Sequence, residues 1–406
     1  MKKLLIIEDD QVVANIYRHK FAVEGYQVDV ALDGLAGLEK VRLFRPDVVI
    51  LDLLLPGVSG VEVLKQLRAE TEYAKLPVVV FSNTYLSSIM QEAWKAGATL
   101  CLSKANCSPR QLIDGVRNAL FPNDASATLF APPTAAAGAI VSSPLTAESP
   151  AAETHPETRD RDAAFQADLR NSFITSFPAT LATLRSLLRE LNQAGDETAR
   201  LKPLGELYRR IHALTGNAGI AGVPHVARLS DALEALLKEL CETPRNINAS
   251  TLRTVALAVD GLAPLGEQSV PPNQPQTSAP RVLVVDHETL SRRALVYALE
   301  KAKLDSVNID DSIAAYELLV GNSFDLIFLD VDLPGLNGFE LSARLRALPA
   351  HQATPVVLVT SLSDFENHAN APQNGGNDFI GKPFLFIEVV VKALAHVLRG
   401  PLFAVQ

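Results

Sequence analysis

The two ends of this 406-residue chain carry the same sequence pattern, displaced by 278 positions. An apolar run followed by acids occurs as "KKLLIIEDD" and "PRVLVVDHE", and a longer signature occurs as "PDVVILDLLLPGVSGVEVL" and "FDLIFLDVDLPGLNGFELS". Four polar positions of the first copy keep their spacings of 44, 30 and 22 residues in the second copy: Glu8, Asp52, Ser82 and Lys104. A register that holds over 96 residues predicts a duplicated domain.

Each copy alternates between short apolar runs and longer amphipathic segments. In the first copy the apolar runs fall at residues 3–7, 27–31, 48–51, 78–81 and 99–102. The segments between them have the spacing of amphipathic helices, about 10–15 residues long. This alternation is typical of βαβ units, so we predict a parallel sheet with helices on both faces in each copy.

Two segments rich in Ala, Pro, Ser and Thr divide the chain. They cover residues 122–160 and 267–280, and neither has a helical or strand period. Such composition is typical of flexible linkers. We therefore predict three folded domains, at 1–121, 161–266 and 281–399.

The middle segment has a different pattern from the two copies. Its apolar residues recur with the period of an α-helix, for example at Phe173, Phe177, Leu181, Leu184, Leu187, Leu188 and Leu191. No strand-like alternation accompanies this stripe. The pattern predicts an all-α antiparallel bundle between the two α/β domains.

The composition of the chain argues against several classes of protein. The net charge of −9 argues against a nucleic-acid partner, which normally meets a basic face. Three cysteines, an odd and small number, favour a reducing compartment. No apolar run approaches the roughly 18 residues that a bilayer span needs. The N-terminal "MKKLLIIEDD" has too few consecutive apolar residues for a secretory signal peptide. We expect a cytoplasmic protein without membrane insertion.

Polar side chains follow the predicted strands of the first copy. Glu8 and Asp9 follow the first strand, Asp52 the third, Ser82 the fourth and Lys104 the fifth. These strand ends meet at one edge of an open parallel sheet. Three carboxylates at one point favour a hard divalent cation such as Mg²⁺, held by Glu8, Asp9 and Asp52. A cation, a lysine and a hydroxyl beside one aspartate suit phosphoryl transfer, with Asp52 as the nucleophile.

These residues closely resemble the receiver domain of two-component response regulators. The resemblance implies a flavodoxin-like fold, with a five-stranded parallel sheet of order 2-1-3-4-5. It also implies Mg²⁺, a sensor histidine kinase as partner, and phosphorylation of Asp52 with Ser82 and Lys104 assisting. The sequence departs from the family at Ala105, where a proline often follows the lysine, and at Cys101, where many members have an aromatic residue.

The second copy retains the phosphorylation pattern and changes one metal position. The retained residues are Asp286, Asp330, Thr360 and Lys382. His287 stands where the first copy has Asp9, which in the family is the principal metal ligand. A neutral imidazole suits zinc or copper better than magnesium, so we expect a weakened Mg²⁺ site at Asp286 and Asp330, unless Asp332 compensates. Asp330 is then either a weak phosphoacceptor or part of a receiver that only docks partners.

The middle segment contains a histidine within a helical pattern, in "RRIHALTGNAGIAG". Thr215, Gly216 and Gly219 share the face of His212, so this face is open to a partner's site. The segment resembles the histidine-containing phosphotransfer (HPt) domain, whose motif is His-x-Leu-Lys-Gly-x-Ala, with Thr215 in place of the lysine. The resemblance implies that His212 exchanges a phosphoryl group with receivers. The alternative is a histidine at the edge of a helix core, with glycines that permit tight packing.

Two functions remain compatible with the sequence. The first is a phosphorelay protein, a regulatory protein rather than an enzyme with a separate substrate, whose receivers catalyse their own phosphoryl transfer and hydrolysis. The second is a signalling scaffold, switched at Asp52, in which the bundle and the second receiver only bind partners. A glycine-rich nucleotide loop is absent from the sequence, which argues against a kinase ATP site.

Overall fold

The computed structural model describes residues 1–82, 87–104, 107, 109–121, 156–267, 280–363 and 378–399. The chain forms two units, which comprise Met1–Thr175 with Gly216–Pro224, and Ser176–Thr215 with His225–Gln406. Most of the two predicted linkers lies outside the described residues. Residues 156–160, assigned to the first linker by composition, instead belong to a helix that begins at Pro156.

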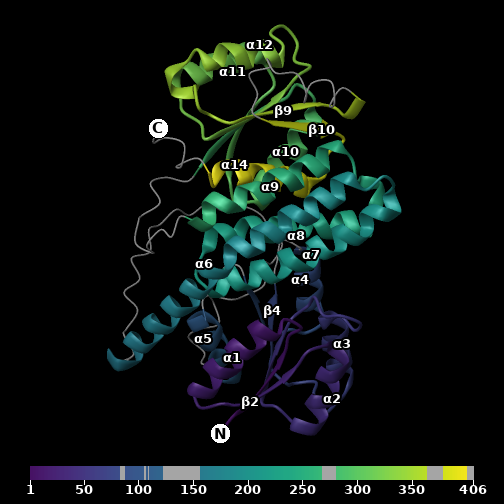
Figure 1. The fold of residues 1–406 in the computed structure, drawn as a ribbon, viewed down its shortest axis with the longest axis vertical. Helices are drawn as coiled ribbons and strands as arrows, with labels where there is room; N and C mark the ends of the chain where they lie inside the picture. Colours follow the sequence, from purple (N-terminus) through teal and green to yellow (C-terminus); the bar gives the residue numbers. More distant parts are fainter. Residues whose placement is uncertain are drawn as a thin grey trace. The chain divides into compact units, whose positions relative to one another are not determined.

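The N-terminal domain, purple to blue in Figure 1, contains a five-stranded parallel sheet. Its strand order is β2-β1-β3-β4-β5. Its strands are β1 (Lys3–Ile7), β2 (Gln27–Ala31), β3 (Val48–Leu51), β4 (Val78–Ser82) and β5 (Leu100–Ser103). Its helices are α1 (Gln11–Val23), α2 (Gly34–Phe44), α3 (Gly60–Ala69), α4 (Ser87–Lys95) and α5 (Pro109–Leu120). The predicted strand order and class of fold are confirmed.

Helices cover both faces of this sheet, which explains why its central strands β1, β3 and β4 are almost entirely apolar. Successive strand residues point to opposite faces. Leu4 and Ile6 of β1 therefore join a buried cluster with residues of α1 and α5. Leu5 and Ile7 join a second cluster with residues of α2 and α3. A strand that is buried on both sides has no position for a solvated side chain except at its end.

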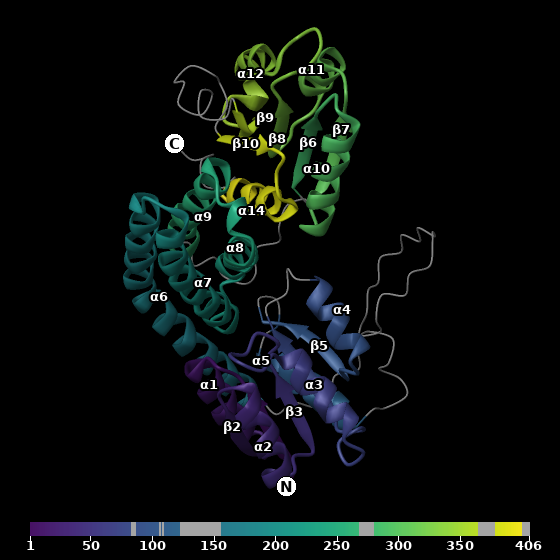
Figure 2. The same cartoon turned by 90° about the vertical axis from the view of Figure 1, so that its right-hand side faces the viewer.

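The C-terminal domain repeats this architecture, with sheet order β7-β6-β8-β9-β10 (Figure 2). Its strands are β6 (Arg281–Val285), β7 (Asp305–Ile309), β8 (Leu326–Asp330), β9 (Val356–Ser361) and β10 (Asp378–Lys382). Its helices are α10 (Thr289–Lys301), α11 (Ser312–Gly321), α12 (Gly338–Arg346) and α14 (Phe386–Val397).

The middle segment is helical, as its periodicity predicts. Its helices are α6 (Pro156–Gln193), α7 (Glu197–Ile220), α8 (Pro224–Glu242) and α9 (Ala249–Glu267). The predicted apolar stripe of α6 is buried except at Leu187, which is partly exposed, and Leu184 and Leu191 are fully inaccessible to solvent. Among the helices of the described ranges, none is long and apolar enough to cross a bilayer.

A glycine fixes the loop after the third strand in each copy. A Cβ atom at Gly60 would lie 2.0 Å from the backbone oxygen of Asp52, and one at Gly338 would lie 2.2 Å from that of Asp330. Real Cβ atoms do not approach this closely, so only glycine permits the turn. The repeated "PGxxG" thus has a steric origin: it brings the following helix back against the residue that ends the strand.

Candidate functional site

The polar residues at the strand ends of the N-terminal domain form one buried cluster around Asp52. The Ser82 hydroxyl donates a hydrogen bond to Asp52 Oδ1 at 2.6 Å. The Lys104 ammonium donates to Asp52 Oδ2 and, at 2.7 Å, to Glu8 Oε1. All four side chains are almost inaccessible to solvent. The structure therefore brings together the residues that the strand-end argument predicts.

Burial and charge determine the protonation of this cluster. The pKa of Glu8 is raised to about 8, mainly by burial; Lys104 opposes this rise, and the neighbouring charge of Asp52 adds to it. Burial alone would lower the pKa of Lys104, but the two carboxylates outweigh it and raise that pKa. Lys104 thus remains a cation that faces Asp52, where a phosphoryl group would carry its negative charge.

Three consecutive acids follow β1, and the structure gives them different positions. Glu8 pairs with Lys104. The Asp10 side chain caps α1 by accepting hydrogen bonds from two backbone N–H groups. An oxygen of Asp9 lies within 4.8 Å of one of Asp52, close enough for both to bind one cation. These two carboxylates fit Mg²⁺, which prefers oxygen donors, whereas the predicted third ligand, Glu8, has its carboxylate on the lysine.

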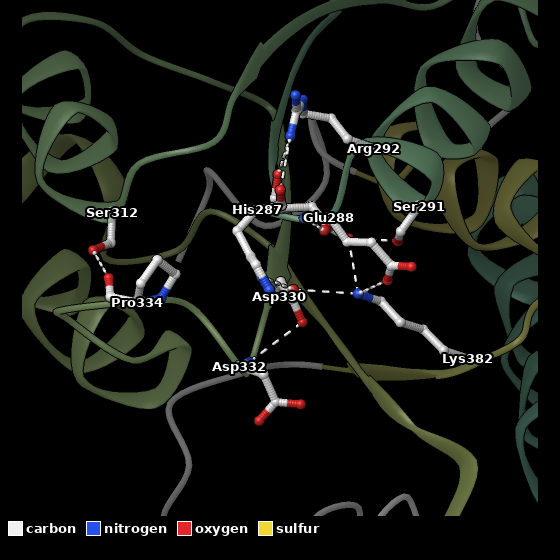
Figure 3. A network of polar contacts seen from close by, with 10 residues as sticks. His287, Glu288, Ser291, Arg292, Ser312, Asp330, Asp332, Pro334 and Lys382 are labelled. Carbon is white, nitrogen blue, oxygen red and sulfur yellow. Dashed lines mark hydrogen bonds and ion pairs between the residues drawn. The ribbon is translucent and has the colours of Figure 1, made fainter.

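The second copy has an equivalent cluster around Asp330, which is fully buried at the end of β8 (Figure 3). The Lys382 ammonium lies 3.2 Å from Asp330 Oδ2 and 3.1 Å from Asp286 Oδ2. His287 Nδ1 lies 3.0 Å from the same oxygen of Asp330. One ligand atom each from Asp286, His287 and Asp330 lies within 4.8 Å of the others. This donor set contains an imidazole and fits Mg²⁺ less well than the carboxylates of the first copy.

Neighbouring residues of the second cluster have structural contacts. The side chain of Asp332 points away from Asp330, and only its backbone N–H approaches, at 3.3 Å from Asp330 Oδ1 (Figure 3). Asp332 is therefore not placed to replace the missing carboxylate. Asp286 accepts a hydrogen bond from Ser291. Thr360 is buried in β9, in register with Gly381 of β10.

His212 lies on α7 and contacts an acid of the next helix. Its Nδ1 is 2.7 Å from Oε1 of Glu234, a buried residue of α8. A carboxylate accepts hydrogen bonds, so Nδ1 carries the proton and the lone pair of the neutral ring is on Nε2. Sequence reasoning missed Glu234. The signal that could have found it is an acid between Leu233 and Ala235 in a helix that is apolar on most sides.

Two polar residues near His212 on α7 contact groups of their own helix. The Thr215 hydroxyl, in the position of the family's lysine, donates to the backbone oxygen of Ile211 at 2.9 Å. Such a bond to the preceding turn satisfies the hydroxyl within the helix. Arg209, one turn before His212, forms an exposed ion pair with Glu206 at 2.5 Å.

Comparisons with known proteins agree with this architecture. The response regulator receiver domain matches residues 4–117 and 282–394, more than half of the chain, and the Hpt domain matches residues 168–263. The transcriptional regulatory protein SrrA of Staphylococcus aureus is 32% identical over 118 residues, which are 29% of this chain and 48% of SrrA. The chain thus spans about half the length of the curated relatives it matches.

Solved structures resemble single domains of the chain. The chemotaxis protein CheY4 of Vibrio cholerae is 29% identical, with 30% of this chain and 99% of CheY4 covered and a TM-score of 0.28. The receiver domain of the sensor histidine kinase PA1611 of Pseudomonas aeruginosa, solved with a coordinated magnesium ion, is 22% identical, with 29% and 98% covered and a TM-score of 0.27. By its two matched domains, the chain belongs to the response regulator receiver family, with an Hpt domain between its two receivers.

Proposed function

We propose that this protein is a phosphorelay protein in which Asp52 and His212 carry the phosphoryl group. The observation that carries the proposal is the buried cluster of Asp52, Ser82 and Lys104, repeated around Asp330 at the other end of the chain. The three modules are receiver 1 (1–121), the HPt bundle (161–266) and receiver 2 (281–399). Their partners are a sensor histidine kinase and other receivers, and we propose a cytoplasmic location.

Asp52 is the proposed acceptor from the kinase. One of its carboxylate oxygens attacks the phosphorus of a phosphohistidine, a P–O bond forms, and the P–N bond breaks as the imidazole leaves. Lys104 and Ser82 already contact the two oxygens of Asp52, so they also lie beside an attached phosphoryl group. Asp9 and Asp52 would hold Mg²⁺, which would supply positive charge against the phosphoryl oxygens.

His212 is the proposed transfer residue. Nε2 attacks the phosphorus of an aspartyl phosphate, the new P–N bond forms, and the aspartate carboxylate leaves. Glu234 acts as a positioning residue, because its contact with Nδ1 fixes the tautomer and orients the ring. The contact also stabilises the positive charge that develops on the ring during attack.

We propose that Asp330 is a weaker acceptor than Asp52, with Thr360 and Lys382 in the assisting positions. His287 replaces a carboxylate ligand, and its imidazole contacts Asp330 directly. Asp286 and Asp330 remain the proposed cation ligands of receiver 2. We attribute the weaker phosphorylation of Asp330 to weaker metal binding, because the contact between Lys382 and Asp330 is retained.

Labelling of single variants tests the relay. A cognate kinase and labelled ATP are supplied to the parent chain and to Asp52→Ala, His212→Ala and Asp330→Ala. We expect an acid-labile, alkali-stable label that His212→Ala removes and an aspartyl label that falls most in Asp52→Ala. A chain that never carries phosphohistidine would refute the relay. It would favour the scaffold alternative, which the occupied Thr215 hydroxyl and the imidazole at His287 support.

A further inference from the structure

Helix α9 of the bundle packs against the second receiver. It lies along α14 and contacts the edge strand β10, and all three elements belong to the same unit of the structure (Figures 1 and 2). We call the surface formed by β10 and α14 the β10–α14 edge. An edge strand with an uncovered flank exposes backbone donors and acceptors, and α9 covers part of this one.

Buried hydrogen bonds cross from α9 to the β10–α14 edge. The Glu388 carboxyl of α14, 1% exposed, accepts from the hydroxyl of Ser250 at 2.6 Å and from that of Thr254 at 3.1 Å. Ser250 Oγ in turn accepts from the backbone N–H of Gly381 in β10 at 3.0 Å. Burial raises the pKa of Glu388. Buried polar groups without partners are costly, so each side of this contact satisfies groups that the other side buries.

Charged residues extend the contact. Arg253 Nε of α9 donates to Asp378 Oδ1 of β10 at 3.2 Å, and its guanidinium lies 6.0 Å from the ring centre of Phe379. Arg399, just after α14, donates to the backbone oxygen of Leu257 in α9 at 2.8 Å. Because these hydrogen bonds lie at several points along α9, they hold the helix on the second receiver and also fix its position along the β10–α14 edge.

The first receiver lacks the residues of this surface, although it has the same fold. At the 278-residue offset, Asp378 corresponds to Leu100 and Glu388 corresponds to Arg110. A leucine and an arginine cannot accept the hydrogen bonds that α9 donates. The two copies thus differ at the edge that α9 covers, so these hydrogen bonds are a specific property of the second receiver.

The residue of β10 that contacts α9 is adjacent in sequence to a residue of the Asp330 pocket. Gly381, which donates to Ser250, directly precedes Lys382, whose ammonium contacts Asp330. Gly381 is also in register with Thr360 on β9. A displacement of Lys382 or Thr360 that accompanies a change at Asp330 therefore moves the backbone group to which α9 is anchored.

We propose that α9 is the resident partner of the second receiver and that it couples the Asp330 pocket to the bundle. The path runs from Asp330 through Lys382 and Gly381 to Ser250 of α9. An external protein then has no access to the covered part of the β10–α14 edge, and the state of the pocket is communicated within the chain. That phosphorylation of Asp330 is the event which α9 reports rests on the proposed phosphorelay function. The structural coupling between the Asp330 pocket and α9 does not depend on that function.

Hydrogen–deuterium exchange of the full-length chain tests the docking. We expect Ser250→Ala to raise exchange about tenfold in residues 249–257 and 378–391, because it removes a hydrogen bond to a carboxylate and one from a backbone amide. Thr183→Ala is the matched control, since it also removes a hydroxyl, here an exposed one that donates within its own helix α6. Exchange in Ser250→Ala that equals the control across both segments would overturn the docking.

A second variant tests the coupling without any phosphodonor. Lys382→Met removes the ammonium from the Asp330 pocket, and we expect exchange across residues 249–257 to change by at least about threefold. Lys104→Met, the same substitution in the first receiver, should leave that segment unchanged. Unchanged exchange on α9 in Lys382→Met would overturn the coupling, whatever happens near Asp330. Failure of phosphate labelling at His212 would instead refute the phosphorelay and leave this result intact.

Discussion

Replacing Glu234 with alanine should slow phosphoryl transfer to His212 by roughly ten- to a hundredfold. The Nδ1 to Oε1 distance of 2.7 Å is that of a strong, charge-assisted hydrogen bond. Such a bond to a charged group contributes about 1.5–3 kcal/mol, and each 1.4 kcal/mol corresponds to a factor of ten. Without it, the ring loses its preference for the tautomer with the lone pair on Nε2, and the developing positive charge loses its counter-charge.

Glu234→Gln separates these two effects. The glutamine oxygen still accepts a hydrogen bond from Nδ1, so the tautomer is kept while the charge is lost. We expect roughly a three- to tenfold reduction, between the parent and the alanine variant. The assay is single-turnover transfer of labelled phosphate from a phosphorylated receiver to the full chain, with alkali-stable label as the readout.

The matched control is Glu242→Gln at the end of the same helix, where the side chain is 63% exposed. It should transfer at the parental rate. Circular dichroism must show that the Glu234 variants retain their helices. Parental transfer by a folded Glu234→Ala chain would refute the positioning role, and equal losses in the alanine and glutamine variants would assign the effect to charge alone.

Three further predictions concern receiver chemistry and stability. His287→Asp should raise Mg²⁺-dependent labelling of Asp330 by an acyl phosphate roughly tenfold or more, since a carboxylate replaces an imidazole; unchanged labelling would show that His287 does not limit the site. In chemical denaturation, Gly60→Ala should lower the free energy of unfolding by about 1–3 kcal/mol through its backbone clash, whereas Gly205→Ala, in open space on α7, should raise it by about 0.5–1 kcal/mol. Burial alone would raise the pKa of Asp378, but a buried lysine and a histidine outweigh it and lower that pKa. The charged form of Asp378 therefore stabilises the fold above the ordinary pKa of 3.8, and this stabilisation is lost as the pH falls below that value. Asp378→Asn should have a lower free energy of unfolding at neutral pH, and this free energy should fall less on acidification than that of the parent chain. Acid transitions that run parallel in the two proteins would contradict this prediction.

Much of the fold follows from local sequence, because the central strands are buried on both faces and polar residues stand at their ends or directly after them. The alternation of apolar runs and helical segments gives the parallel sheet, and the strand ends give Asp52, Ser82 and Lys104. The same argument does not show how the three consecutive acids divide their contacts. Only the structure shows that Glu8 faces Lys104 and that Asp10 caps α1, and the role of Glu8 as a cation ligand stays a prediction.

Other contacts depend on packing that the sequence does not encode locally. Glu234 reaches His212 across 22 residues, and Ser250 reaches Glu388 across 138. Both acids have apolar neighbours in sequence, and such an acid indicates a buried partner but not its identity. The partner is determined by which helix faces which, and that depends on the topology of the whole bundle and its contact with the second receiver.

The divergence of the two receivers indicates how the chain divides its tasks. Both copies keep the buried acceptor, the lysine and the glycine that closes the loop, which preserves the geometry of the pocket. They differ at one metal position, where His287 replaces a carboxylate, and at the β10–α14 edge, where Glu388 binds the bundle's own helix. We propose that the first change weakens loading by a phosphodonor and that the second couples the pocket to the bundle. Together they favour a first receiver that accepts the signal and a second receiver that adjusts the bundle from within the chain.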